Sequence, residues 1–204
     1  MKRKDFFDSN AQTWDNDIYL KMTEKKIKNL IIPLLELKND DKVIDIGSGT
    51  GILVPFIQEY LESGNKITEL DFSEQMIKTA KKKYADTINC ISSNAENIPV
   101  KCNSFSKAII FNSFPHFEDK QKVICEIFRI LKNNAIILLA HSDSKNVIDR
   151  RHKQIGGAVA NDILPSTDKL KTMFEKAGFT NIESLDSNEF FYIKAIKQEE
   201  SRDV

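Results

Sequence analysis

The sequence predicts an α/β fold built on a doubly wound sheet of seven strands, mostly parallel with one antiparallel strand. After residue 40, short runs rich in β-branched residues alternate with segments of helical period. Strands separated by helix-length segments are joined by right-handed crossovers, which makes their sheet parallel. Only a few polar residues, among them Asp186, Ser187 and Asn188, separate the last two runs. They are too few for a crossover, so these two runs are expected to pair as an antiparallel hairpin.

The predicted elements follow one another in a regular order. The strands are expected at residues 42–46, 66–71, 88–92, 107–112, 135–141, 181–185 and 190–197. The helix after the second strand begins at Ser73, a residue type that caps helix N-termini. The helix before the sixth strand ends at Gly178, which suits a left-handed helix terminus. Apolar stripes along these helices are expected to pack on the sheet.

Two segments fall outside this alternation. Residues 1–38 are predicted to form an N-terminal helical lid, and residues 39–204 the main domain. Residues 142–165 form an insertion after the fifth strand, which contains the adjacent pair Gly156 and Gly157. Because the carboxyl ends of the strands carry the ligand crevice in such sheets, both segments are expected to cover the site.

Composition excludes several classes of function. The 204 residues include 30 Lys and Arg against 30 Asp and Glu, so the chain lacks the net positive charge that most duplex-binding proteins use. No run approaches the roughly 20 apolar residues that span a bilayer. The three cysteines show no C-x-x-C spacing and are interpreted as reduced thiols of a cytoplasmic protein. We therefore expect a small-molecule partner and neither nucleic acid nor membrane.

The most informative motif is the stretch Val43–Gly51, VIDIGSGTG, whose glycines directly follow the first strand. Its G-x-G-x-G spacing differs from the G-x-G-x-x-G of dinucleotide sites. Asp45, two residues before the first glycine, would repel a phosphate and attract a cation. Asp71, at the end of the second strand, is placed where a carboxylate reaches ribose hydroxyls. The predicted ligand combines a ribose with positive charge and lacks phosphate.

From about residue 40 onward the chain resembles the class I S-adenosylmethionine-dependent methyltransferases, especially the small-molecule group. VIDIGSGTG resembles their first motif, residues 93–99 resemble their D-A-E-x-L-P motif, and residues 6–15 resemble their N-terminal lid. This resemblance implies a Rossmann-like domain and S-adenosylmethionine as cofactor. The residues it implies for binding are Asp45 at the ammonium group, Gly47, Ser48 and Gly49 at the methionine part, Asp71 at the ribose, Phe72 and Met76 at the adenine, Asn94 (in place of the usual aspartate), Ala95 and Glu96 at the adenine edge, and Asn112 at the sulfonium.

Three histidines are candidates for catalysis. His116 follows the fourth strand, His141 ends the fifth, and His152 lies in the insertion. Each is expected near the carboxyl edge of the sheet, where histidine suits the removal of a proton from an acceptor. Packing among aromatic and aliphatic side chains is the alternative for all three. A further hypothesis is that two or three of these histidines bind a divalent metal such as zinc or iron, with Asp162 or Asp143 as an additional ligand.

The sequence thus predicts an enzyme that transfers a methyl group from S-adenosylmethionine to O, N or S of a small molecule, with His116, His141 or His152 as base or acceptor ligand. One alternative is an NAD(P)-dependent oxidoreductase, which the glycine spacing and Asp45 disfavour. Another is a non-catalytic subunit that binds the cofactor and supports a partner protein. Neither the acceptor nor the oligomeric state follows from the sequence.

Overall fold

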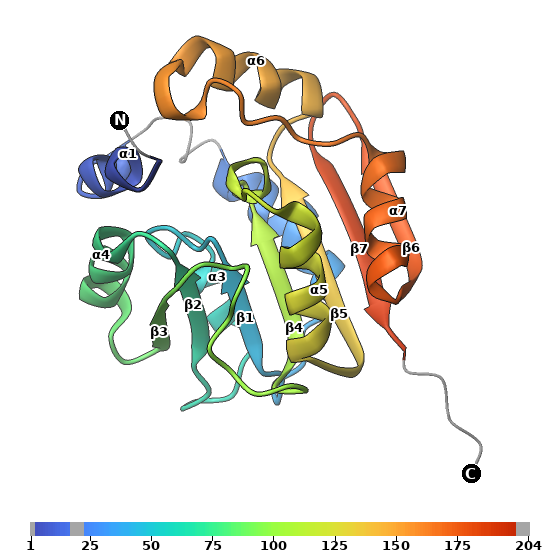
Figure 1. The fold of residues 1–204 in the computed structure, drawn as a ribbon. Helices are drawn as coiled ribbons and strands as arrows, with labels where there is room; N and C mark the ends of the chain where they lie inside the picture. The colour runs from blue at the N-terminus through green and yellow to red at the C-terminus, as the bar shows by residue number, and fades with distance from the viewer. Residues whose placement is uncertain (1–2, 17–22, 199–204) are drawn as a thin grey trace.

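The seven strands form one sheet in the order β3-β2-β1-β4-β5-β7-β6 in the computed structural model, which describes residues 3–16 and 23–198 (Figure 1). The strands are β1 (Val43–Ile46), β2 (Ile67–Asp71), β3 (Ile88–Ser92), β4 (Phe105–Phe111), β5 (Leu131–His141), β6 (Phe179–Asp186) and β7 (Phe191–Lys197). β1 to β5 pair in parallel, and β7 runs antiparallel to both of its neighbours, β5 and β6. The predicted fold class is confirmed.

The strand order reverses at β1, which pairs with β2 on one side and β4 on the other. Ligands of doubly wound sheets bind at such a reversal, outside the carboxyl ends of the strands. β5 begins at Leu131, four residues before the predicted Ala135, because Leu131 is already extended and pairs with Phe105 of β4. Asn134, which is left-handed (φ 61°), lies where the register of β5 against β4 shifts.

Helices cover both faces of the sheet. α5 (Lys120–Ile130) and α7 (Thr167–Ala177) pack on one face, and η2 (Ile27–Ile31), η3 (Ile32–Leu35), α3 (Val54–Gln58) and α4 (Glu74–Tyr84) pack on the other. The predicted helix ends are confirmed: the Ser73 side chain accepts a hydrogen bond from the backbone of Met76, and Gly178 ends α7 with φ 100°. The two faces bury separate apolar clusters.

The N-terminal region divides into two parts with different surroundings. α1 (Arg3–Asn10) and η1 (Trp14–Asn16) lie at the carboxyl edge of the sheet, beside α4. η2 and η3 instead bury Ile27, Ile31, Ile32 and Leu35 in the core. Residues 17–22 of the predicted lid lie outside the described residues. Within residues 3–16 and 23–198, no helix is long and apolar enough to cross a membrane.

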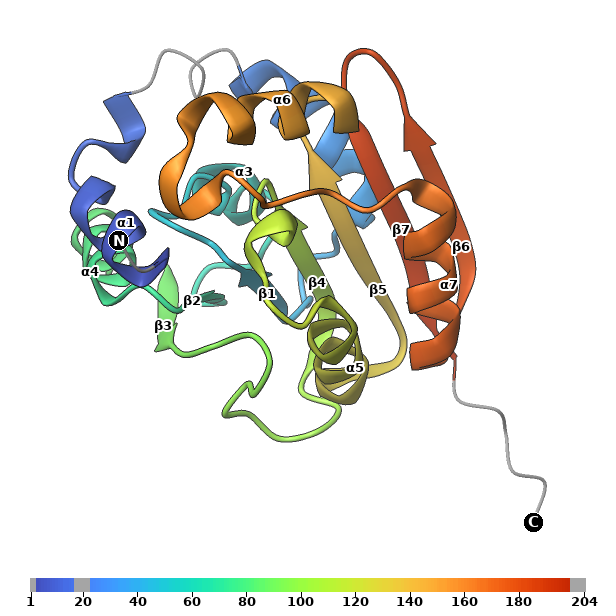
Figure 2. The same cartoon turned by 45° about the horizontal axis from the view of Figure 1, so that its top comes forward.

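The insertion after β5 forms the helix α6 (Lys145–Ile155) and the short turn η5 (Gly157–Val159). Figure 2 brings this edge of the molecule forward and shows α6 and α1 over the ends of the strands. Ile148 packs into the core, whereas Ile155 is half exposed. The two extra segments of the chain therefore meet at the edge where the sequence places the site.

Candidate functional site

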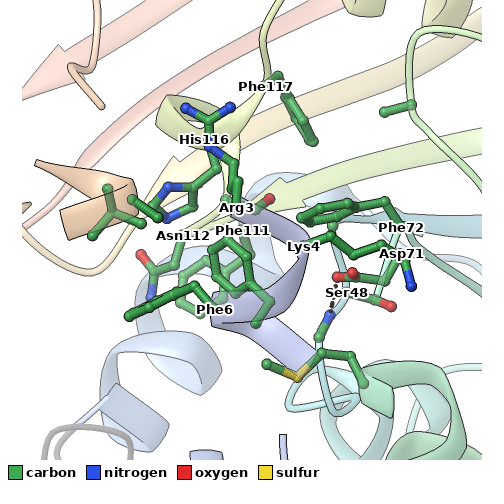
Figure 3. A pocket seen from close by; sticks show the side chains of 18 of the residues that line it. Arg3, Lys4, Phe6, Ser48, Asp71, Phe72, Phe111, Asn112, His116 and Phe117 are labelled. Atoms are coloured by element: carbon green, nitrogen blue, oxygen red, sulfur yellow. Dashed lines mark hydrogen bonds between the residues drawn. The ribbon is translucent and has the colours of Figure 1, made fainter. Parts of the chain in front are cut away.

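A cavity of about 790 Å³ lies where β1, β2, β3, β4 and β5 end. Its walls include residues at the ends of strands or directly after them, such as Gly47, Asp71 and Asn112, together with side chains of α1 and α6. Figure 3 shows part of this lining, with Ser48, Asp71 and Phe72 on one side and Asn112 and His116 on the other. The volume lies within the range of pockets that bind drug-sized ligands and cofactors.

The glycine loop is held in shape by β2. The backbone N–H groups of Gly47 and Ser48 both donate to the carbonyl oxygen of Leu70, at 2.7 and 3.1 Å. One carboxylate oxygen of Asp71 accepts from the backbone N–H of Gly49 at 2.9 Å, and the other accepts from that of Ser73 at 2.8 Å. Each oxygen keeps a further lone pair for a ligand. Burial raises the pKa of Asp71 to about 6.

The close approach of two loops requires glycine at position 47. Its backbone has φ +71°, and a Cβ atom there would lie 2.5 Å from the hydroxyl oxygen of Ser113. That hydroxyl donates to the carbonyl oxygen of Ile46 at 3.0 Å. The loop after β1 therefore packs directly against the loop after β4, and both border the cavity.

The structure brings together all the predicted cofactor residues except one. Those that line the cavity are Gly47, Ser48, Gly49, Asp71, Phe72, Met76, Asn94, Ala95, Glu96 and Asn112. Asp45 does not line it. Its side chain is 1% exposed and lies beneath the glycine loop, because alternate residues of a strand point to opposite faces. A direct contact between Asp45 and a bound ammonium group remains a prediction.

Asp45 has a buried neighbour that the sequence reading missed. β1 and β2 pair in register at Asp45 and Glu69, so both carboxyl groups lie on the same face of the sheet. Glu69 is fully buried, and neither of its carboxyl oxygens has a hydrogen-bond partner among the described residues. Burial and the charge of Asp45 raise the pKa of Glu69 well above its ordinary value, while burial and Asp71 raise that of Asp45 to about 8. An acid in the middle of a strand that is expected to be buried on both faces was the available signal.

Aromatic side chains close the cofactor side of the cavity. The Phe7 ring lies 5.6 Å from that of Phe72 and 5.7 Å from that of Trp14, measured between ring centroids. Phe7, Met76 and Val159 share one buried cluster. The sequence reading noted residues 6–15 only as a resemblance to a lid, and the structure shows that α1 supplies part of the wall.

Polar side chains fix the neighbouring loops. Asn94 accepts a hydrogen bond from the backbone N–H of Glu96 at 2.9 Å, which shapes the turn after β3. Asn112 is left-handed (φ 54°), and its side-chain oxygen accepts from the backbone N–H of Ser142 at 2.9 Å. The ends of β4 and β5 are thereby tied together beside the cavity.

All three histidines line the cavity. His116 Nδ1 lies 2.7 Å from a carboxylate oxygen of Asp162, and His152 Nδ1 lies 2.6 Å from the backbone carbonyl oxygen of Asp162. Burial lowers the pKa of His116, although Asp162 opposes this shift, and burial lowers the pKa of His141 to about 3. The imidazoles of His116 and His141 are therefore neutral at pH 7.

The metal site predicted from His116, His141 and His152 is not formed. Within the described residues, no group of three or more His, Cys, Asp or Glu side chains is arranged to hold a metal ion. His116 and His152 each use a ring nitrogen on Asp162, whose second carboxylate oxygen is taken by Arg3 at 2.6 Å. Asp143 pairs instead with Arg151 at 2.6 Å. His116 and His152 are therefore hydrogen-bonded to Asp162, and Asp143 is paired with Arg151.

Comparison with known proteins agrees with this geometry. Residues 44–139 match a family model described as a methyltransferase domain. These residues therefore form a methyltransferase domain, and the fold of the chain is that of class I S-adenosylmethionine-dependent methyltransferases. The cavity fits that cofactor, because the Asp71 carboxylate can accept from two ribose hydroxyls and Phe72 and Met76 give an apolar surface for the adenine.

The methyltransferase is similar in sequence to proteins named "Ubiquinone/menaquinone biosynthesis C-methyltransferase". The one from Wigglesworthia glossinidia brevipalpis is 28% identical over 143 residues, and the match covers 67% of this chain but only 57% of that protein. The one from Escherichia coli O1:K1 is 26% identical, with coverage of 87% and 82%. A relative from Methanocaldococcus jannaschii is 29% identical, and the chain spans 61% of its length.

Solved structures share the fold of the methyltransferase. A SAM-dependent methyltransferase from Thermotoga maritima, described as a possible histamine N-methyltransferase, gives a TM-score of 0.73 at 20% identity, covering 94% of this chain and 98% of that one. A putative S-adenosylmethionine-dependent methyltransferase from Methanococcus maripaludis gives 0.69 at 22% identity, with coverage of 98% and 94%. At these identities the likeness concerns the fold.

Asp71→Asn is expected to weaken binding of S-adenosylhomocysteine about 10- to 100-fold, because a charged acceptor for the ribose hydroxyls is lost. Since the Asp71 pKa is about 6, wild-type affinity should also fall as the pH drops through 6, and this fall should be absent in the variant. Isothermal titration calorimetry between pH 5 and 8 measures both effects. Asp168→Asn, an exposed substitution in α7, is the matched control. Equal pH dependence in wild type and D71N would contradict the assignment.

Glu69→Gln is expected to stabilise the ligand-free protein by about 1 kcal/mol at pH 9 and to have little effect at pH 5. A carboxyl group whose pKa is raised by folding contributes stability below its unfolded pKa, and that stability is lost as the pH rises toward the folded pKa. The wild type should therefore lose stability from about pH 4.5 upward, and E69Q should lose less. Urea unfolding at the two pH values measures this, with exposed Glu183→Gln as control. If the free energy of unfolding changes equally with pH in wild type and E69Q, an unfavourable burial of ionised Glu69 is excluded.

Proposed function

We propose that the protein transfers the methyl group of S-adenosylmethionine to a small hydroxylated aromatic molecule, with His116 as the general base. The observation that carries this proposal is the division of one cavity into two sides. Asp71 and the glycine loop supply one side, and histidines with aromatic and aliphatic side chains supply the other. A donor and an acceptor bound together in this cavity would be held close enough for direct transfer.

His116 is the best placed of the three histidines to act as a base. A carboxylate only accepts hydrogen bonds, so the Asp162 contact requires a proton on Nδ1 and leaves the Nε2 lone pair of the neutral ring available. His141 is buried, with a pKa near 3, and so is a poor acceptor of protons at neutral pH. His152 packs against the His116 ring, with 4.8 Å between ring centroids, and is bound to the backbone of Asp162.

The acceptor side favours an aromatic molecule. Phe6, Phe117, Ile148 and Val159 line the cavity, and they offer apolar surface for a ring. The nearby arginines are already engaged, Arg151 with Asp143 and Arg3 with Asp162. The relatives named for quinone biosynthesis also fit an aromatic acceptor. Because they are named C-methyltransferases, we include a ring carbon beside the hydroxyl group with the O, N and S atoms that the sequence predicts as acceptors.

The proposed chemistry is a displacement at carbon. S-adenosylmethionine supplies a methyl group activated by its positive sulfur. His116 removes the acceptor hydroxyl proton onto Nε2, and the resulting oxyanion, or the ring carbon it activates, forms the new bond to the methyl carbon. If the ring carbon is methylated, that carbon then loses its own hydrogen as a proton to solvent and the oxygen takes back the proton from Nε2, which restores the aromatic phenol. The carbon–sulfur bond breaks and its electron pair stays on sulfur, which gives S-adenosylhomocysteine. Burial keeps His116 neutral and ready for this step.

We also propose a small-molecule partner rather than nucleic acid, and a cytoplasmic location. The cavity is covered by α1 and α6, which leaves little room for a polymer. The formal net charge is zero. Cys90, Cys102 and Cys125 are free thiols, as expected in a reducing compartment.

His116→Gln is expected to lower kcat about 100-fold or more with a phenol or catechol acceptor, because a general base contributes at least that much. An aromatic thiol that is already ionised at neutral pH needs no base, so its methylation should fall only a few fold in the same variant. Release of S-adenosylhomocysteine from a panel of phenols, catechols, aromatic amines and thiols measures both rates. Affinity for S-adenosylhomocysteine serves as the folding control and should be unchanged.

Three results would contradict the proposal. An equal loss with phenol and thiol would exclude His116 as a base. Tight binding of S-adenosylhomocysteine without turnover of any acceptor would favour the non-catalytic subunit. Binding of NADH in place of S-adenosylhomocysteine would favour the oxidoreductase.

A further inference from the structure

Asp162 connects three separate parts of the chain at the acceptor side. One carboxylate oxygen lies 2.7 Å from His116 Nδ1, and the other accepts from the guanidinium of Arg3 at 2.6 Å. Its backbone carbonyl oxygen lies 2.6 Å from His152 Nδ1. The Asp162 side chain is only 5% exposed. Every hydrogen-bonding atom of this carboxylate is therefore engaged, and Arg3 from α1 holds one of its two oxygens.

The helix that carries Arg3 also contacts the cofactor side. Asp8 accepts a hydrogen bond from the Ser73 hydroxyl at 2.6 Å, next to the Asp71 carboxylate. The Phe7 ring packs against Phe72, and on its other side it lies 5.1 Å from the His116 ring between centroids. One short helix thus touches the predicted adenine site and the predicted base at once.

Resting on the function proposed above, we propose that Arg3 is a positioning residue for the base. By docking α1 on Asp162, Arg3 keeps His116 neutral. A cofactor that orders α1 through its contacts with Phe72 and Phe7 favours this docked arrangement. The ligand concerned is the adenosyl cofactor already proposed. The new element is the link from the cofactor side, through α1, to the protonation state of His116.

The charges around His116 determine the direction of the effect. The Asp162 carboxylate stabilises the imidazolium form, and the Arg3 guanidinium and the neighbouring His152 oppose it. Two further titratable groups belong to this cluster of charges. The charges of Asp162 and Arg3 act on the pKa of Lys120 in α5, and the charge of His116 acts on the pKa of His141 in β5. When Arg3 withdraws, Asp162 is left without its cation and holds a proton on His116 more strongly. Docking of Arg3 on Asp162 therefore favours the neutral imidazole of His116, which can act as a base.

The contact is buried enough to matter. Arg3 is about one quarter exposed and Asp162 almost fully buried, so solvent and salt screen their interaction less than they screen a surface ion pair. By contrast, the second partner of Arg3, Glu118, is 78% exposed at 3.3 Å. Of the two carboxylates near Arg3, Asp162 is the one whose charge acts on His116.

The test follows the imidazole protons by NMR across a pH titration of the wild type, Arg3→Gln and Arg3→Lys. The chain has only three histidines, so the His116 signal is identified as the one absent from His116→Gln. In R3Q the midpoint of the His116 titration should move to higher pH. In R3K, which keeps the positive charge, the midpoint should lie close to that of the wild type. Arg150→Gln removes an exposed charge from α6 and should leave the midpoint unchanged.

Addition of S-adenosylhomocysteine to the wild type should move the His116 midpoint further down, and R3Q should abolish this response. In activity measurements with a phenol, the acidic limb of the pH–rate profile of R3Q should move to higher pH, while the plateau stays within about twofold of wild type. A merely structural role of Arg3 would lower the plateau and leave the limb in place.

The outcomes separate this inference from the proposed function. Equal His116 midpoints in ligand-free wild type and R3Q would overturn the role of Arg3, whatever the activity. If S-adenosylhomocysteine binds but leaves the His116 midpoint unchanged, the link to the cofactor is overturned. If R3Q shifts the midpoint as expected but no acceptor is methylated, the role of Arg3 stands and the proposed function fails.

Discussion

The pairing of β1 with β2 on one side and β4 on the other is the constraint on which the rest of the site depends. It brings the loops after these strands to one edge, where the Asp71 carboxylate holds the loop after β1 and the start of α4 together. Because Ser113 occupies the space beside Gly47, the loop after β4 is fixed against the same glycine. The cofactor side is therefore preformed by backbone contacts within the sheet.

The electrostatics of the cavity fit a positively charged ligand. Asp71 lines it, and Asp45 and Glu69 lie buried beneath its glycine loop. The opposite wall carries histidines, and burial keeps His116 and His141 neutral, so they add no positive charge next to a sulfonium. Ionisation of Asp45 or Glu69 is costly, since a desolvated carboxylate without a partner is unfavourable and burial raises the pKa of both groups. A bound cation would offset part of that cost and favour the ionised forms, which links these buried acids to binding at the loop.

Local patterns in the sequence were sufficient for the sheet, the glycine loop and the ends of α4 and α7, because each depends on neighbouring residues. The contacts of Asp162 with Arg3 and His116 were not predictable in this way, since they join residues 159 and 46 positions apart. The metal hypothesis failed for the same reason: the histidines were correctly placed at one edge, but their partners came from elsewhere in the chain. The position of the Asp45 side chain could have been predicted from the alternation of side chains along the strand. The resemblance to the family motif does not take this alternation into account.

The insertion between β5 and α7 differs from the sheet in one practical respect. α6 contributes Ile148 and His152 to the acceptor side of the cavity and nothing to the hydrogen bonds that shape the glycine loop. A library of variants restricted to residues 145–155 would therefore sample new acceptors while the cofactor site stays intact. Asp162 lies outside that window, and His152, which holds its backbone, is best kept unchanged, so that directed evolution can vary selectivity without disconnecting the N-terminal helix from the base.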